Sequence, residues 1–196
     1  MGAHSAVGSN VASASERFVD SWRFLVLIEL AKLAIRDQAN RDAEVARTLR
    51  EFIEKTWGQV EFTPGEFFGK THYELVGEFK PSFQGALLGS VGRKSVERSH
   101  LGDTLNATLS WLEAALSRVM VPAHRYFVLF DDLDKGYDKP DEEYKQRLVG
   151  LLLAAYRTAV WASDNGMSAR AVVFLRSDIF DELGFSDKTR SMTTHL

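Results

Sequence analysis

The spacing of hydrophobic positions changes along the chain and divides it into expected helices and strands. Before residue 122, apolar residues recur at the three- and four-residue intervals of an amphipathic helix in three segments, 15–35, 42–57 and 103–121. Asp103 suits the N-cap of the last of these, and Pro122 follows its end. Between 58 and 94, frequent glycine and aromatic residues favour short strands and loops instead.

The last third of the chain alternates between short apolar runs and one long amphipathic segment. The runs 126–130 and 171–175 predict buried strands, the first buried on both faces, and 141–162 between them predicts a helix. Residues 179–183 start a further short helix. A strand–helix–strand order makes the two strands parallel with a right-handed crossover. We therefore expect an α/β fold with a parallel sheet and a helix-rich N-terminal half.

Length and composition limit the class of protein. With 196 residues, 45% of them hydrophobic, the chain suits one domain with a core of its own. We place this domain at 14–196, with a helix-rich part at 14–121 and a βαβ part at 122–196, after a small, polar and flexible lead-in at 1–13. A net charge of −3 does not favour nucleic acid as the main partner.

Cysteine usage and hydropathy bear on the compartment. The chain has no cysteine, which excludes disulfides and a thiol nucleophile and fits a reducing compartment. No apolar run approaches membrane length, and the N-terminus lacks the basic and apolar regions of a signal peptide. We therefore expect a cytoplasmic protein without a membrane partner.

Carboxylates follow the first predicted strand directly. Asp131, Asp132 and Asp134 come after Phe130, and such neighbours repel one another unless a cation, usually a metal ion, lies among them. In open α/β sheets, ligands bind at the carboxyl ends of the strands. The layout is that of a Walker B segment, in which Asp131 holds Mg²⁺ through water and Asp132 positions the attacking water. A buried strand followed by an ordinary acidic turn is the alternative.

The second predicted strand also ends in polar residues, Arg176, Ser177 and Asp178. In P-loop NTPases, the strand after Walker B commonly ends in a polar sensor of the γ-phosphate, a role that Arg176 or Ser177 fits. A structural ion pair between Arg176 and one of the carboxylates after the first strand is an equally good interpretation. The two interpretations do not exclude each other.

A phosphate-binding loop is not evident. The pattern is G-x-x-x-x-G-K-[ST], and the nearest segment, 65–71, matches only its end because Pro64 stands where the first glycine belongs. A glycine turn with an exposed lysine is the default interpretation there. A faint likeness to an EF-hand at 132–143 fails because Gly136 and Tyr137 occupy places that need other residues. The five histidines form no metal-binding pattern.

The segments YFVLFDDLDKGYD, LVGLLLAAYRTAV and AVVFLRSDIFDELGFSDKTR resemble the second half of a bacterial P-loop ATPase core. The branch is the loosely AAA+-like one of STAND- and KAP-type signalling NTPases, many of which belong to antiphage defence systems. The resemblance implies a P-loop NTPase-like sheet with helices on both faces and Mg²⁺-ATP as ligand. It implies Asp131 as the metal-side carboxylate, Asp132 at the catalytic-acid position and 176–178 as the sensor region.

Two departures from the family pattern shape the functional expectation. An aspartate, Asp132, stands where the family has glutamate, and its shorter arm is expected to slow hydrolysis; Walker A is absent. We therefore expect an incomplete piece of a larger ATPase that binds ATP weakly or not at all alone. Its partners would be nucleotide and either further copies of itself or a protein effector. The alternatives are a non-catalytic pseudo-ATPase or interaction module, and an unrelated α/β domain with a metal-binding strand end.

Overall fold

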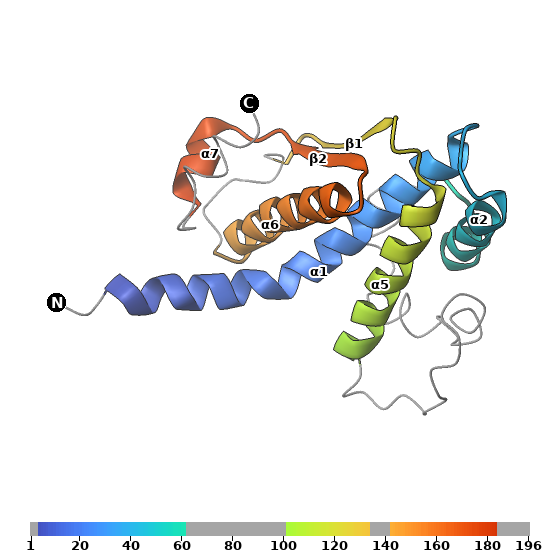
Figure 1. Ribbon diagram of the computed structural model, residues 1–196. Coiled ribbons are helices and arrows are strands. Elements are labelled where there is room, and N and C mark those ends of the chain that lie inside the picture. Colours follow the sequence, from blue (N-terminus) through green and yellow to red (C-terminus); the bar gives the residue numbers. More distant parts are fainter. Residues whose placement is uncertain (1–3, 62–100, 134–141, 184–196) are drawn as a thin grey trace.

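A long helix, α1, lies at the centre of the fold and contacts α2, α5, α6 and β1 (Figure 1). The structure is a computed structural model and describes residues 4–61, 101–133 and 142–183. Its elements are α1 (His4–Arg36), α2 (Ala43–Trp57), α5 (Leu101–Val119), β1 (Arg125–Phe130), α6 (Glu142–Asp164), β2 (Ser168–Val173) and α7 (Ser177–Glu182). The chain is thus a helix-rich α/β protein.

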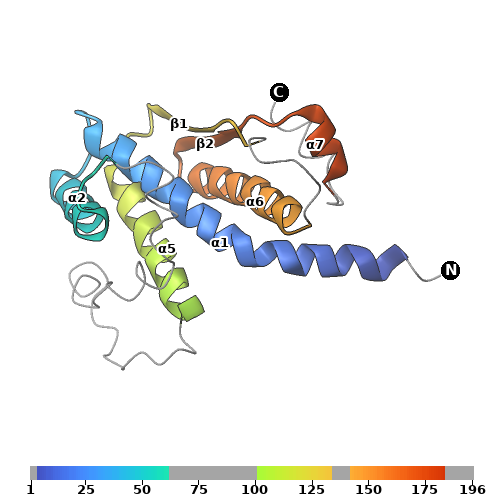
Figure 2. The same cartoon turned by 180° about the vertical axis from the view of Figure 1, so that it is seen from behind.

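The two strands form a parallel sheet, as the strand–helix–strand order predicts. Arg125 pairs with Ser168 at one end, and Phe130 pairs with Val173 at the other. Both α1 and α6 lie on the same side of this sheet, which the two opposite views show (Figures 1 and 2). Within the described residues, no helix combines the length and apolar character needed to cross a membrane.

The main core lies where α1, α2, α5 and the covered face of the sheet meet. Trp111 of α5 is the largest fully buried side chain, and its ring packs edge-on against Phe52 of α2 with 5.0 Å between centroids. On the other flank of α1, the Trp22 indole N–H donates to the backbone oxygen of Arg147 in α6 at 2.9 Å. The apolar stripes predicted for these helices are therefore the surfaces that form the core.

The second helix follows its sequence pattern closely. The side chain of Asp42 caps it by accepting a hydrogen bond from the Val45 N–H at 3.1 Å. Gly58 ends it in the left-handed conformation (φ 82°), and its N–H donates to the oxygen of Glu54 at 2.7 Å. The predicted range 42–57 is confirmed because both ends carry local capping residues.

Several element boundaries differ from the predictions, three of them with a clear cause in the sequence. Helix α1 begins at His4, so the segment expected to be a flexible lead-in is largely helical; its small residues permit a helix but carry no apolar stripe. Helix α5 begins at Leu101, so Asp103 is not its N-cap. Strand β2 covers 168–173, earlier than predicted, because its first half alternates polar and small residues.

The sheet is buried on one face, so the expectation of a strand buried on both faces is wrong. Tyr126 and Val128 of β1 are buried, whereas Phe127 and Leu129 are 46% and 63% exposed. The alternation follows from the pleat, which points successive side chains to opposite faces. The second layer of helices expected on the opposite face is absent from residues 4–61, 101–133 and 142–183.

Candidate functional site

The segments after β1 and β2 leave the sheet at the same edge, which we call the carboxyl edge. The register pairs Phe130 with Val173, and the Phe174 N–H extends the pairing by donating to the Phe130 oxygen at 2.8 Å. Asp131 and Asp132 follow β1 at this edge, and residues 176–178 follow β2. The sequence prediction that these polar residues share one edge is therefore correct in its topology.

A small apolar cluster anchors the carboxyl edge to the start of α6. Leu133, next to the two aspartates, and Leu175, next to Arg176, both pack against this cluster. Its buried members are Leu148, Val149, Ile179 and Leu183. The Tyr144 hydroxyl of α6 also donates a hydrogen bond to the Leu133 oxygen. Both turns are thus held by side chains that lie behind them, which leaves the polar residues facing solvent.

The two aspartates form a tight, unusual turn. Both are exposed, and the Asp132 N–H donates to the Asp131 carboxylate at 2.8 Å. Asp132 has a φ of 60°, in the left-handed region that residues other than glycine rarely adopt. Aspartate tolerates this region better than most residues because its short side chain can form local hydrogen bonds. Strained residues of this kind are often found at ligand sites.

The residues after β2 form an ion pair within their own turn. The Arg176 guanidinium donates two hydrogen bonds to the two carboxylate oxygens of Asp178, at 3.1 and 2.6 Å. The hydrogen bond from Arg176 is the main reason that the pKa of Asp178 lies below its usual range. Ser177 between them is the first residue of α7 and is exposed. Arg176 thus has a carboxylate partner two residues along the chain.

The carboxyl edge offers few ligands for a metal on its own. Among the described residues, no three His, Asp or Glu side chains gather as a metal-binding group would require. Asp131 can supply one carboxylate to a hydrated Mg²⁺, which usually keeps several of its waters. Asp134, the glycine-rich segment 65–71 and most of the EF-hand-like segment 132–143 lie outside the described residues.

A hydrogen-bond network that the sequence did not predict lies at the opposite end of β1. The Asp37 Oδ2 atom accepts a hydrogen bond from the Tyr126 hydroxyl at 2.6 Å and lies 2.6 Å from Nδ1 of His124. Its other oxygen accepts from the Ala39 N–H at 2.9 Å. These bonds, with that from Tyr126 the largest cause, lower the pKa of Asp37 to about 2.

The pKa of Tyr126, the tyrosine of this network, is shifted in the opposite direction from that of Asp37. Burial, followed by its bond to Asp37, raises the pKa of Tyr126 to about 12, so the phenol remains a donor. Its oxygen also accepts a hydrogen bond from the Val121 N–H at 3.1 Å. The network therefore ties the loop after α1 to the loop that precedes β1, a structural role that needs no ligand.

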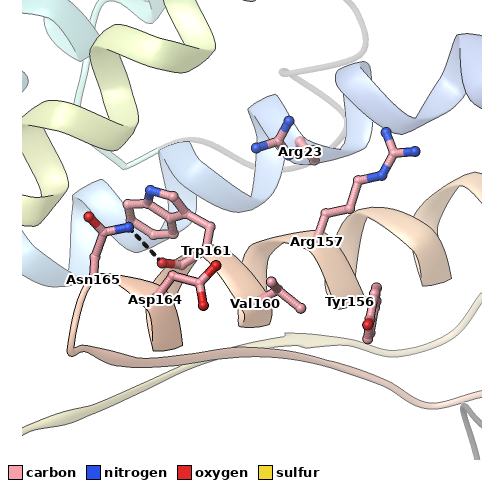
Figure 3. Close-up of a pocket in the computed structure, with 7 residues that line it drawn as sticks. All are labelled: Arg23, Tyr156, Arg157, Val160, Trp161, Asp164 and Asn165. Atoms are coloured by element: carbon pink, nitrogen blue, oxygen red, sulfur yellow. Dashed lines mark hydrogen bonds between the residues drawn. The ribbon is translucent and has the colours of Figure 1, made fainter.

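A shallow hollow of about 340 Å³ lies between α1 and α6 (Figure 3). Its lining residues are Arg23, Tyr156, Arg157, Val160, Trp161, Asp164 and Asn165. Arg23 reaches it from α1 and pairs with Glu113 of α5. None of the residues that line the hollow belongs to the carboxyl edge, so the hollow is not part of the predicted site.

No family model, curated protein or solved structure matches the chain. The class that the described fold defines is a helix-rich α/β protein with a parallel βαβ unit and a polar carboxyl edge.

Proposed function

We propose that the chain is the Walker B and sensor half of a cytoplasmic P-loop ATPase core that acts as a nucleotide-driven switch. The observation that carries the proposal is the parallel pairing of Phe130 with Val173, which directs Asp131, Asp132 and the segment 176–178 to one edge. Ligands of parallel α/β sheets bind at this edge. The defence setting that the sequence resemblance implies belongs to the same proposal.

Each polar residue of the edge has a role in this proposal. Asp131 holds Mg²⁺ through its water shell, and Asp132 positions the water that attacks the γ-phosphate. Arg176, with Ser177, senses the γ-phosphate. Asp178 holds the Arg176 guanidinium while no phosphate is bound. The γ-phosphate then competes for the guanidinium, because phosphate accepts the same paired hydrogen bonds as a carboxylate. The strained φ of Asp132 supports a functional role for this turn.

A non-catalytic interaction module is the second candidate. The exposed apolar face of the sheet, which includes Leu129 at 63% exposure, favours it because large exposed apolar patches usually mark interaction surfaces. This candidate would retain the sheet and helices but would not need nucleotide at the carboxyl edge.

Calorimetric titration with Mg²⁺-ATP distinguishes the two candidates. The chain should bind with a dissociation constant of about 1 mM or weaker, because one or two carboxylates hold Mg²⁺ poorly without a phosphate loop. The Asp131→Ala variant should lose this binding. Asp164→Asn is the matched control, since Asp164 is exposed and lies at the end of α6 that leads into the start of β2, away from the carboxyl edge; it should bind like the wild type.

Two other results are possible. Sub-millimolar binding that survives Asp131→Ala contradicts the assignment of the site. No heat from any variant, with the fold intact, is expected both of an ATPase half without its phosphate loop and of the interaction module, so the result that separates the two candidates is binding that Asp131→Ala removes.

A further inference from the structure

The face of the sheet that points away from α1 and α6 is a continuous apolar strip, which we call the open sheet face. Its large side chains are Phe127 at 46% exposure, Leu129 at 63% and Phe174 at 51%. Val172, paired with Leu129 across the two strands, adds to the strip. In the described part of the chain these are three of the five most exposed large hydrophobic residues. Such clustering indicates a surface that another molecule covers.

Opposite charges stand at the two ends of the open sheet face. Arg125 begins β1 and is exposed on the same face as Phe127. Arg170 of β2 is exposed on this face as well, but it pairs with Phe127 and therefore lies beside the apolar side chains. Asp131 and Asp132 stand exposed at the other end of β1. Arg125 and Asp131 are separated by six residues, or about 20 Å at about 3.3 Å per residue. Along β1 the face is therefore basic at one end, apolar in the middle and acidic at the other end, and Arg170 adds a positive charge beside Phe127 on β2.

We propose that the open sheet face pairs with the same face of a second copy of this chain, with the strands of the two copies antiparallel. A two-fold axis that lies in the interface and crosses the strands near Val128 produces this arrangement. Arg125 and Asp131 are each three residues from Val128, so the axis brings Arg125 of each copy to Asp131 of the other. A two-fold contact that matches a patch to itself is the commonest symmetry of homo-oligomers.

The charges select this orientation over its alternative. A two-fold axis along the strands would stack the same apolar side chains but would put Arg125 against Arg125 and Asp131 against Asp131. Like charges facing each other across an interface are strongly unfavourable. The antiparallel arrangement instead makes two equivalent pairs of opposite charges at the ends of β1, on either side of the apolar side chains Phe127 and Leu129.

The size of the face predicts a weak dimer. A stable, specific interface covers about 800 Å² on each partner. Three half-exposed side chains offer only part of that area, because even a fully buried aromatic residue covers about 150–250 Å². We therefore expect a dissociation constant of about 10–100 μM, as for a transient complex. The dimer needs no nucleotide, so it can be tested separately from the proposed ATPase function.

Sedimentation velocity over a range of concentrations tests the apolar part of the contact. The wild-type chain should pass from monomer to dimer near the expected dissociation constant. Leu129→Glu should weaken the dimer by about tenfold or more, because it buries a charge in place of an apolar side chain. Val160→Glu is the matched control: Val160 is 40% exposed and lines the hollow between α1 and α6, and α6 covers the opposite face of the sheet, so its change should leave the dimer intact.

A mixing experiment tests the charge pairs of the contact. Arg125→Glu makes both ends of the face acidic, and Asp131→Lys makes both ends basic. Each variant should remain monomeric alone after its folding is verified by circular dichroism, and a 1:1 mixture should form a heterodimer at least as tight as the wild-type dimer. A mixture that stays monomeric overturns the charge pairing. Because the chain has no cysteine, a short bis-maleimide cross-linker then tests the orientation: it should link Arg125→Cys to Asp131→Cys in a mixture and should link neither variant to itself. Variants that each link to themselves overturn the antiparallel orientation.

A wild-type chain that stays monomeric at about 1 mM overturns the whole proposal, since a contact weaker than that is below the range of specific complexes. The open sheet face would then be covered by another part of this chain or by a different protein.

Discussion

Replacing Trp111 with alanine should lower the free energy of unfolding by about 3–5 kcal/mol, the usual cost of removing a large buried aromatic side chain. Trp111 is 1% exposed at the centre of α5 and packs at 5.0 Å against Phe52 of α2. The cavity left behind would lie in the main core, where α1, α2 and α5 meet. Urea unfolding followed by circular dichroism measures the change, because the helices dominate that signal.

Tyr156→Ala is the control for this prediction. Tyr156 is also a large aromatic residue in a helix, but it is 48% exposed on α6. Its removal should change the free energy of unfolding by less than about 1 kcal/mol, as for most surface positions. Equal losses in the two variants would mean that Trp111 does not occupy the core of the folded chain.

Asp37→Ala should lower the free energy of unfolding by about 1.5–3 kcal/mol at pH 7, the usual range for hydrogen bonds to a charged group. The variant removes the acceptor of the Tyr126 hydroxyl and of the Ala39 N–H, and the contact with His124. Tyr126→Phe, which deletes one donor and keeps the carboxylate, should cost less. Urea unfolding at pH 7 measures both.

The same network predicts how stability depends on acid. The pKa of Asp37 is lowered from 3.8 to about 2 in the folded chain, so the folded state binds fewer protons than the unfolded state. The contribution of Asp37 is therefore complete above pH 4 and is lost as the pH falls from about 4 to about 2. Asp37→Ala should flatten the stability profile in this window. A slope that Asp37→Ala does not change contradicts the network.

The elements that could be predicted are those whose own residues determine where the helix or strand begins and ends. Helix α2 has an apolar stripe, a capping aspartate and a terminal glycine, and its predicted bounds hold. The βαβ order fixed the parallel pairing in the same way. The exposed face of β1 was not predictable, because Phe127 and Leu129 belong to an apolar run that suits a strand covered on both sides.

The candidate site likewise has one part that could be predicted from the sequence and one part that could not. Placing Asp131, Asp132 and Arg176 at one edge needed only strand direction, so the sequence was sufficient. The pairing of Arg176 with Asp178 depends on rotamers in a turn, which the sequence pattern does not encode. The Asp37–Tyr126 hydrogen bond joins residues 89 positions apart, and no local periodicity connects them.

The most direct test of the nucleotide site is paramagnetic line broadening in amide NMR spectra of the chain with millimolar ATP and traces of Mn²⁺ in place of Mg²⁺. Bound Mn²⁺ broadens the signals of nearby nuclei only. The proposal predicts that the signals of Asp131, Asp132 and residues 176–178 broaden first, while those of Asp37 and Ala39, beside the opposite end of β1, stay sharp. Broadening that is centred away from the carboxyl edge, or that persists unchanged in Asp131→Ala, would contradict it.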